Sequence, residues 1–233
     1  MPPKDANKLR RVVGALLDQH GRIPAPPPAN AFEHVLWEKV AYLAADDVRT
    51  RAFEELRTRV GLSPQDILDA KPSTLRQIAR IGGAIGVEDR VRHMQDAAAF
   101  VADTFDGSLD KALRLPRRDA MRALRKIHGV GEPGAETILL FTRTERLLPL
   151  DSNGARVLVR IGYGVDDKNY SAMYRSVREA TTPELVPRFD WLIDTHLVLR
   201  HHGKMICKTS APRCGECSVR AECAFARASA RRS

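Results

Sequence analysis

The sequence predicts an all-α protein, and three observations support that fold class. First, apolar residues recur at helical spacing, for example at Phe53, Leu56 and Val60. Second, signals that start helices are frequent, such as Ser63 placed directly before Pro64. Third, no alternating apolar run is bounded by the residues of hairpin turns, so strands are expected to be few or absent.

The composition is that of an ordinary globular protein. Of the 233 residues, 43% are hydrophobic and 29% are charged, which excludes wholesale disorder and collagen-like structure. The length suffices for a buried core in one large domain or two smaller ones. No run approaches the roughly 18 apolar residues of a membrane span, and the N-terminal residues lack the apolar stretch of a secretory signal. We therefore expect a cytoplasmic protein without a membrane partner.

The charge is strongly positive and unevenly distributed. The formal net charge is +9 and the pI is about 9.7, which suggests a polyanionic partner. Residues 111–128 carry +6 and residues 204–233 carry +5, so the rest of the chain is close to −2. Either segment alone is better explained as a solvated helix face or a basic tail. Binding to a phosphate backbone is favoured because each segment adjoins one of the motifs described next.

A proline-rich stretch separates a short N-terminal helix from the rest of the chain. The helix is expected over about Ala6–His20, and the stretch IPAPPPAN follows at Ile23–Asn30. Its four prolines cannot continue a helix and favour an extended path. We therefore expect this stretch to be a crossing between two parts of the fold.

All four cysteines lie in one short segment with the spacing C-x6-C-x2-C-x5-C. They are Cys207, Cys214, Cys217 and Cys223. Disulfides are unexpected in a cytoplasmic chain that can bury a full core. Four thiolates suit either a tetrahedral zinc ion or a [4Fe–4S] cluster. Structural zinc sites usually have two C-x2-C pairs and this segment has one, so the cluster is the expected cofactor and zinc the alternative.

A glycine-rich corner joins two predicted helices in the middle of the chain. A basic helix of about Arg117–Lys126 runs into the sequence IHGVGEPGA, from which an apolar helix leaves. Gly129 and Gly131 permit a tight turn and a close backbone approach. The amides at a helix N-terminus can bind a phosphate oxygen without reading base sequence. The alternative is a plain corner between two helices.

Asp151 follows an apolar run and opens a further predicted helix, in the sequence LDSN at Leu150–Asn153. Its simplest role is that of the N-cap. A carboxylate fixed at a helix start is also well oriented for catalysis, so the two roles are compatible.

These three features, in this order, resemble the endonuclease III family of DNA base-excision glycosylases. That family has a helix–hairpin–helix of L-P-G-V-G type, then a catalytic Asp, then an iron–sulphur loop. Here the corresponding features are IHGVG at Ile127–Gly131, Asp151, and the loop Cys207–Cys223. The resemblance is specific over about Arg117–Cys223 and only suggestive over Phe32–Arg92.

The resemblance implies two helical lobes with a DNA-binding cleft between them. One would be a helix–hairpin–helix bundle formed by residues 30–148. The other would be an iron–sulphur cluster lobe formed by residues 1–29 plus 149–233. The partner would be double-stranded DNA that contains a damaged base, and the protein would be a monomer in the cytoplasm, associated with the nucleoid if it is bacterial.

The resemblance also assigns roles to individual residues. Asp151 would stabilise the positive charge that develops on the sugar and would orient or deprotonate the attacking water. The four cysteines would bind the cluster. The DNA-binding residues would be Gly129, Val130, Gly131, Lys208, Arg213 and Arg220, and the residues of the base pocket would be Tyr42, Ser152 and Asn153.

The chain departs from the family pattern at two kinds of position. Bifunctional members carry a Lys two residues after the second hairpin glycine, and this chain has Pro133 there, which has no amine to form a Schiff base. Family members also insert side chains into the gap left by a flipped base. The positions that align approximately are Ala44 and Gly83, and both are too small to fill such a gap.

The expected function is therefore that of a monofunctional DNA glycosylase, which hydrolyses the N-glycosidic bond without a lyase step. Two alternatives remain open. One is a catalytically inactive, DNA-binding or lesion-sensing relative, and the other is an abasic-site lyase that uses a different amine. The sequence does not identify the damaged base.

Overall fold

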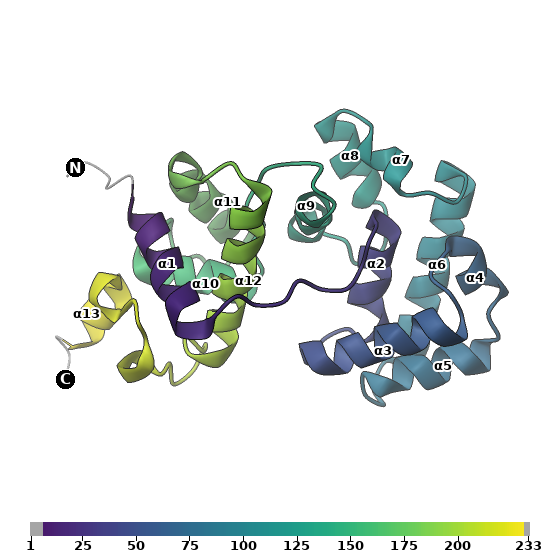
Figure 1. Cartoon of the computed structure of the whole chain (residues 1–233), viewed down its shortest axis with the longest axis horizontal. Helices are drawn as coiled ribbons and strands as arrows, with labels where there is room; N and C mark the ends of the chain where they lie inside the picture. The colour runs from purple at the N-terminus through teal and green to yellow at the C-terminus, as the bar shows by residue number, and fades with distance from the viewer. Residues whose placement is uncertain (1–6, 231–233) are drawn as a thin grey trace. The chain divides into compact units, whose positions relative to one another are not determined.

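The computed structural model describes residues 7–230 of the chain. Within this range it contains thirteen α-helices, three short 3-10 helices and no strand, which confirms the predicted fold class (Figure 1). No helix in the described range is long and apolar enough to cross a membrane. Two arginines of the predicted basic tail, Arg231 and Arg232, lie outside the described residues.

The chain divides into two compact units. The central unit is residues 26–144, and the terminal unit combines the residues up to 25 with those from 145 onward. The predicted lobe boundaries lie at 29/30 and 148/149, and the roles assigned to those lobes stay a prediction.

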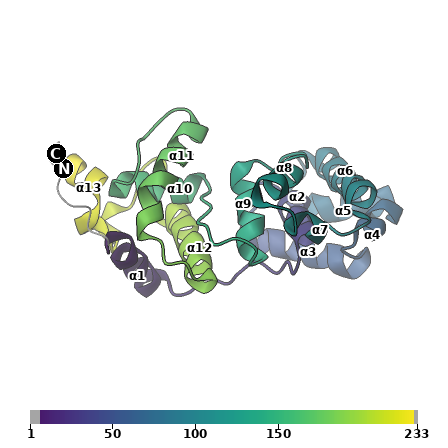
Figure 2. The same cartoon turned by 90° about the horizontal axis from the view of Figure 1, so that it is seen from above.

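The central unit is a helical bundle built around two long helices. Helix α6 packs against α2, α4 and α5, and α3 packs against α2 and α5 (Figure 2). Fully buried side chains at the centre include Phe53, Leu56 and Met94. The helix start predicted at Ser63 is confirmed, because Ser63 and Asp66 cap each other reciprocally through their side chains. The helices of the bundle are α2 (Ala31–Val40), α3 (Asp46–Arg59), α4 (Pro64–Asp69), α5 (Pro72–Ile81), α6 (Val87–Phe105), α7 (Asp110–Leu113), α8 (Arg117–Leu124) and α9 (Glu132–Phe141).

The terminal unit joins the N-terminal helix to the C-terminal part of the chain. Helix α12 packs along both α10 and α1. A buried carboxylate strengthens this connection, since Glu184 Oε2 accepts hydrogen bonds from the amide of Leu9 and the hydroxyl of Tyr163, both at 2.8 Å. The helices are α1 (Lys8–His20), α10 (Ser152–Ile161), α11 (Tyr170–Thr181), α12 (Phe189–Met205) and α13 (Ala224–Ala230).

One buried histidine should make the stability of the central unit depend on pH. His34 on α2 is 5% exposed, and burial lowers its pKa from 6.5 to about 4. Between these two values the unfolded chain binds a proton that the folded unit does not bind, so acidification favours unfolding. His34 should lower the free energy of unfolding by about 2 kcal/mol at about pH 4.5 relative to pH 7. In urea unfolding, the difference between the two pH values should be smaller by about that amount in the His34→Leu variant, and an equal loss in both proteins would contradict the assignment.

Candidate active site

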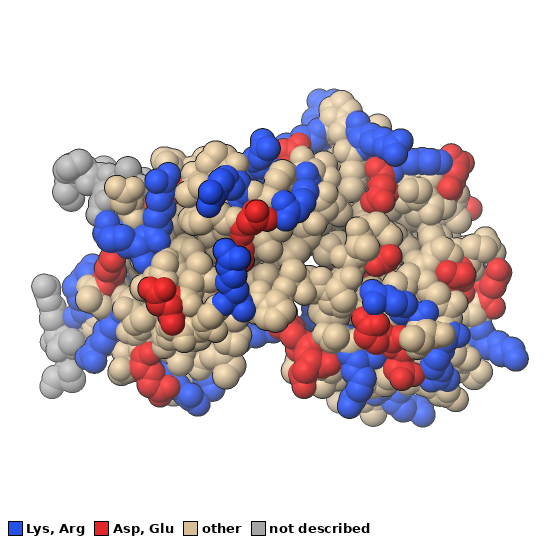
Figure 3. Space-filling model, in the orientation of Figure 1, with Lys and Arg blue, Asp and Glu red and all other residues tan. Residues whose placement is uncertain are grey.

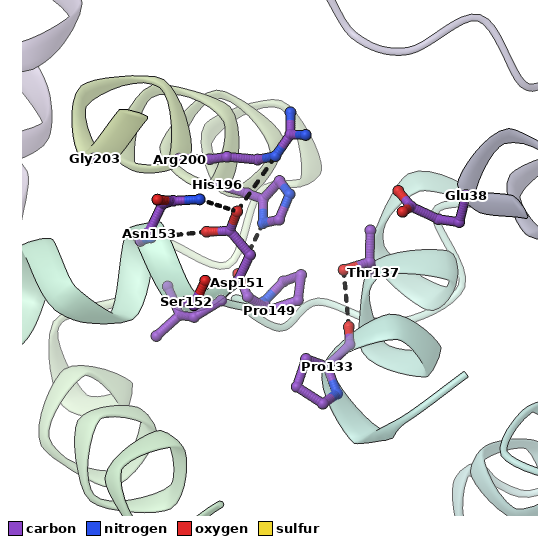
Figure 4. A network of polar contacts seen from close by, with 12 residues as sticks. Glu38, Pro133, Thr137, Pro149, Asp151, Ser152, Asn153, His196, Arg200 and Gly203 are labelled. Carbon is purple, nitrogen blue, oxygen red and sulfur yellow. Dashed lines mark hydrogen bonds and ion pairs between the residues drawn. The ribbon is translucent and has the colours of Figure 1, made fainter. Parts of the chain in front are cut away.

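Asp151 caps the first turn of α10, and both oxygens of its carboxylate are held. Oδ1 accepts the amide of Gly154 at 2.8 Å, which confirms the predicted N-cap. Oδ2 accepts from the Asn153 amide group at 3.1 Å and lies 3.4 Å from Nε of Arg200 (Figure 4). The side chain is 32% exposed, so solvent reaches it. The carboxylate is therefore oriented and accessible, and its catalytic role stays a prediction.

Helix α12 fixes the segment that carries Asp151. Nδ1 of His196 lies 2.8 Å from the carbonyl oxygen of Pro149, two residues before the carboxylate. Arg200 follows His196 by four residues, so both side chains lie on the same face of α12. Figure 4 shows both of them directed towards the start of α10.

Helix α12 also contacts the first turn of α10 directly, backbone against backbone. Gly203 of α12 lies so close to Asn153 that a Cβ at Gly203 would be 2.7 Å from the Asn153 carbonyl oxygen. Arg156 donates to the carbonyl oxygen of Gly203 and to Oδ1 of Asn153, each at 2.8 Å. The Asn153 amide is thereby turned so that its nitrogen faces Asp151.

Replacing Gly203 with Ala should destabilise the terminal unit, because α12 could no longer approach α10. The added Cβ would meet helical backbone, which cannot move aside, and overpacking of this kind costs about 1–3 kcal/mol. Gly14→Ala on α1 is the matched control, since nothing lies within 4 Å of the added Cβ. That change should be neutral or stabilising. Thermal denaturation should separate the two variants, and equal midpoints would contradict this account.

Tyr170 on α11 supports the same segment from another side. Its hydroxyl donates to the carbonyl oxygen of Leu150 at 2.9 Å. Burial, and secondly the charge of Asp151, raise the pKa of Tyr170 to about 12, so the hydroxyl keeps its proton at neutral pH. Tyr170, His196 and Arg200 were all missed in the sequence. Their only signal was helical periodicity, which does not show that three helices meet at Asp151.

The predicted pocket residues fall into both units. Asn153 contacts Asp151, and Ser152 is exposed at the first position of α10. Tyr42 belongs to the central unit, where it is 60% exposed in the loop after α2. The pocket roles of these three residues stay a prediction.

The four cysteines line one hollow in the terminal unit. The hollow has a volume of about 300 Å³, part of it open to solvent, and Arg160 and Phe225 also line it. None of the cysteines forms a disulfide. No three His, Cys, Asp or Glu side chains in the described range gather closely enough to hold one metal ion. Four thiolates are ligands that suit either a tetrahedral zinc ion or a [4Fe–4S] cluster, and the cluster stays a prediction.

Two nitrogen-bearing side chains point at sulphur atoms of this loop. Nη1 of Arg160 lies 3.4 Å from Sγ of Cys207, and Nε2 of His202 lies 3.5 Å from Sγ of Cys217. Burial raises the pKa of the Cys217 thiol, so its thiolate form needs compensating positive charge nearby. The two nitrogen atoms lie within hydrogen-bonding distance of these sulphurs and would stabilise thiolates there.

The three cations predicted to bind DNA occupy different surroundings in the cluster loop. Lys208 is half-buried. Arg213 is exposed and lies 3.6 Å from Glu216. Arg220 is exposed and also lines the cysteine hollow. Their contacts with DNA stay a prediction.

The central unit contains the predicted glycine corner between α8 and α9. Gly129 has a φ of +74°, in the left-handed region, and Gly131 is the N-cap of α9. The ammonium group of Lys39, on α2, donates to the carbonyl oxygen of His128 and so fixes the corner to α2. Figure 3 shows Lys and Arg side chains gathered over α7 and α8, directly before this corner. A helix–hairpin–helix with a basic approach is thus present in the structure.

Two adjoining loops of the central unit expose large apolar side chains. Leu43, which follows α2, is 83% exposed and has a φ of +67°. Ile85, which follows α5, is 90% exposed. The loops touch, because a Cβ at Gly82 would lie 2.7 Å from Cα of Ala41.

These side chains lie next to the positions that the sequence alignment indicated. Ala44 is partly buried against the core, and the carbonyl oxygen of Gly83 accepts a hydrogen bond from Arg90 at 2.8 Å. The large exposed side chains in these two loops are Leu43 and Ile85, and the role of the loops stays a prediction.

Comparisons with known proteins agree with these features. No family model matches the chain. The chain is 25% identical to endonuclease III of Sulfolobus acidocaldarius over 197 residues, and this matched region covers 84% of this chain and 82% of that protein. It is 25% identical over 178 residues to endonuclease III of Thermotoga maritima, covering 76% and 73%. Among solved structures, a non-covalent endonuclease III–DNA complex matches with a TM-score of 0.74 and 19% identity over 97% of this chain and 98% of that one. A thermostable thymine-DNA glycosylase matches with the same TM-score at 18% identity, covering 95% and 98%.

Proposed function

Because the chain belongs with the endonuclease III-like helix–hairpin–helix DNA glycosylases, we propose that it removes a damaged or mismatched base from double-stranded DNA by hydrolysis. One observation carries the proposal most directly. Asp151 is held through both carboxylate oxygens, remains partly exposed, and stands at the start of α10 after the helix–hairpin–helix in the chain. Pro133 in the first turn of α9 has no amine, which supports hydrolysis without a Schiff base.

Asp151 would act mainly through its charge. The enzyme would first flip the target base out of the duplex. Breaking the N-glycosidic bond then builds positive charge on the deoxyribose, and a fixed anion beside it lowers the barrier. Both oxygens already accept hydrogen bonds, so a preorganised negative charge is the contribution that the geometry supports best. The base would leave with the electron pair of the broken bond, a water oriented by the same carboxylate would bond to the sugar carbon, and the proton lost by that water would neutralise the departing base.

The remaining predicted residues would hold the DNA backbone and the cofactor. Backbone amides at Gly129–Gly131 would bind a phosphate, as would Lys208, Arg213 and Arg220. A [4Fe–4S] cluster would be bound by the four cysteines, with Arg160 and His202 donating to two of the sulphurs. The role of the cluster would be structural, because hydrolysis needs no redox step. When bound, it would hold the loop in one conformation.

Leu43 and Ile85 would fill the gap that the flipped base leaves. Apolar side chains are commonly inserted between base pairs by proteins that distort DNA. We expect the Leu43→Ala and Ile85→Ala variants to excise the base about tenfold more slowly, since unstacking costs a few kcal/mol that the wedge offsets. Fluorescence of 2-aminopurine beside the lesion should report less base flipping. Val165→Ala, at an apolar residue of the terminal unit that is 65% exposed, is the control, and equal losses in all three variants would contradict the role.

A panel of duplexes with deaminated, oxidised and alkylated bases, followed by alkali, tests the proposed reaction. Strand breaks that need alkali, with no adduct trapped by borohydride, are expected. Breaks without alkali, together with a trapped adduct, would instead indicate an abasic-site lyase. Salt-sensitive binding without base loss on any lesion would indicate a sensor that has lost the chemistry.

A further inference from the structure

Arg200 has no place in the sequence motifs, yet it reaches the carboxylate of Asp151. Its Nε lies 3.4 Å from Oδ2, and its side chain is only 21% exposed. We propose that Arg200 is a positioning residue for base excision, which locks the Asp151 carboxylate in the orientation that faces the sugar. This inference rests on the function proposed above.

The argument begins with the freedom of an aspartate side chain. Rotation about the Cβ–Cγ bond of Asp is broad and has no sharp minimum. The bond from the Gly154 amide to Oδ1 and the bond from Asn153 to Oδ2 both come from the helix that Asp151 caps. They therefore move together with the carboxylate. Arg200 comes from a different helix and fixes Oδ2 relative to the rest of the terminal unit.

The base of the Arg200 side chain is itself well fixed. One turn earlier on α12, His196 contacts the Pro149 carbonyl oxygen at 2.8 Å. Three residues later, Gly203 lies against the backbone of Asn153. Arg200 is thus held between two anchors on the same helix, and a guanidinium attached at such a point can orient a carboxylate.

The charge of Arg200 works against the proposed chemistry, which makes the test decisive. A guanidinium beside Oδ2 offsets part of the negative potential that a cationic sugar would experience. If charge compensation dominated, removing Arg200 would speed the reaction. If orientation dominates, as we propose, removing Arg200 slows it, because a small misplacement of a catalytic group can cost about a hundredfold in rate.

Single-turnover excision should therefore fall by about 10–100-fold in Arg200→Ala, with partial recovery in Arg200→Lys. Arg175→Ala removes the same charge from an exposed position on α11 and should leave the rate unchanged. In the Asp151→Asn background, Arg200→Ala should have no further effect, because Arg200 acts through that carboxylate. A faster Arg200→Ala variant, or a loss that simply adds to that of Asp151→Asn, would overturn the inference. Unchanged thermal midpoints would confirm that the variants are folded.

A binding measurement separates this inference from the proposed function. A duplex with a protonated pyrrolidine in place of the sugar mimics the cationic transition state, and a tetrahydrofuran duplex is its neutral counterpart. The wild-type protein should bind the cationic duplex more tightly, and the preference should shrink about tenfold or more in Arg200→Ala. If Arg200→Ala retains the full preference, the role of Arg200 is overturned but the proposed chemistry is not. No preference in the wild-type protein would overturn the proposed chemistry and the inference together.

Discussion

The Asp151→Asn variant is expected to lose base excision while keeping its fold. Asparagine caps a helix as well as aspartate does, so the contact with the Gly154 amide can persist. The negative charge beside the sugar is lost, and removal of one such electrostatic contact typically costs 10²–10³ in rate. Single-turnover excision of the lesion identified in the panel should fall at least that far. The thermal midpoint should change by no more than about 2 °C, since the cap remains.

A matched exchange at another helix start controls for changes in capping. Asn169 caps α11 by accepting the amides of Ser171 and Ala172. Asn169→Asp is the reverse exchange at a site away from Asp151 and should leave excision unchanged. Excision at the wild-type rate by Asp151→Asn would show that this carboxylate is a cap and nothing more.

Removal of the proposed [4Fe–4S] cluster is expected to have the largest effect on stability. Chelation of iron, or the Cys217→Ser change, should abolish the absorption band at about 400 nm that is typical of a [4Fe–4S] centre. The loop also holds the N-terminal helix, because Gln19 donates to the Glu216 carbonyl oxygen at 2.6 Å and Ser218 donates to that of Ala15 at 3.1 Å. Loss of the cluster should therefore release both the cysteine loop and the N-terminal helix. The free energy of unfolding should fall by at least the ~2–5 kcal/mol that loss of a native disulfide costs.

Limited proteolysis identifies which part of the chain is released. After removal of iron, cleavage should begin in α1 and in the cysteine loop, while residues 26–144 stay resistant. Metal analysis separates the alternatives. One zinc per chain in colourless protein would overturn the cluster, and undiminished stability without any metal would overturn the structural role.

Local spacing in the sequence predicted the features that are built within one short segment. The all-α class followed from helical periodicity, and the cap at Asp151 followed from an apolar run that ends at a polar residue. The corner at Gly129–Gly131 and the grouping of the cysteines around one hollow were likewise visible in the spacing. Each of these depends on neighbours along the chain, and therefore needs no knowledge of how helices pack.

Features formed by separate helices could not be predicted in the same way. Arg200 and His196 lie about fifty residues after the carboxylate segment they hold, and nothing in their spacing shows which helix faces α10. The proposed wedge residues Leu43 and Ile85 were not singled out, because an approximate alignment is uncertain by one or two positions in a loop. An offset of that size separates Ala44 from Leu43 and Gly83 from Ile85.

The discontinuous make-up of the terminal unit has a consequence for biosynthesis. Helix α1 is translated before the central unit, whereas its partners, α12 and the cysteine loop at Glu216, are translated after that unit. The contiguous central unit can complete its core while translation continues, because domains generally form in order from the N-terminus. Until α12 has been translated, the apolar face of α1 has no partner from the later segment of its own unit, so the terminal unit should complete its fold after the central unit.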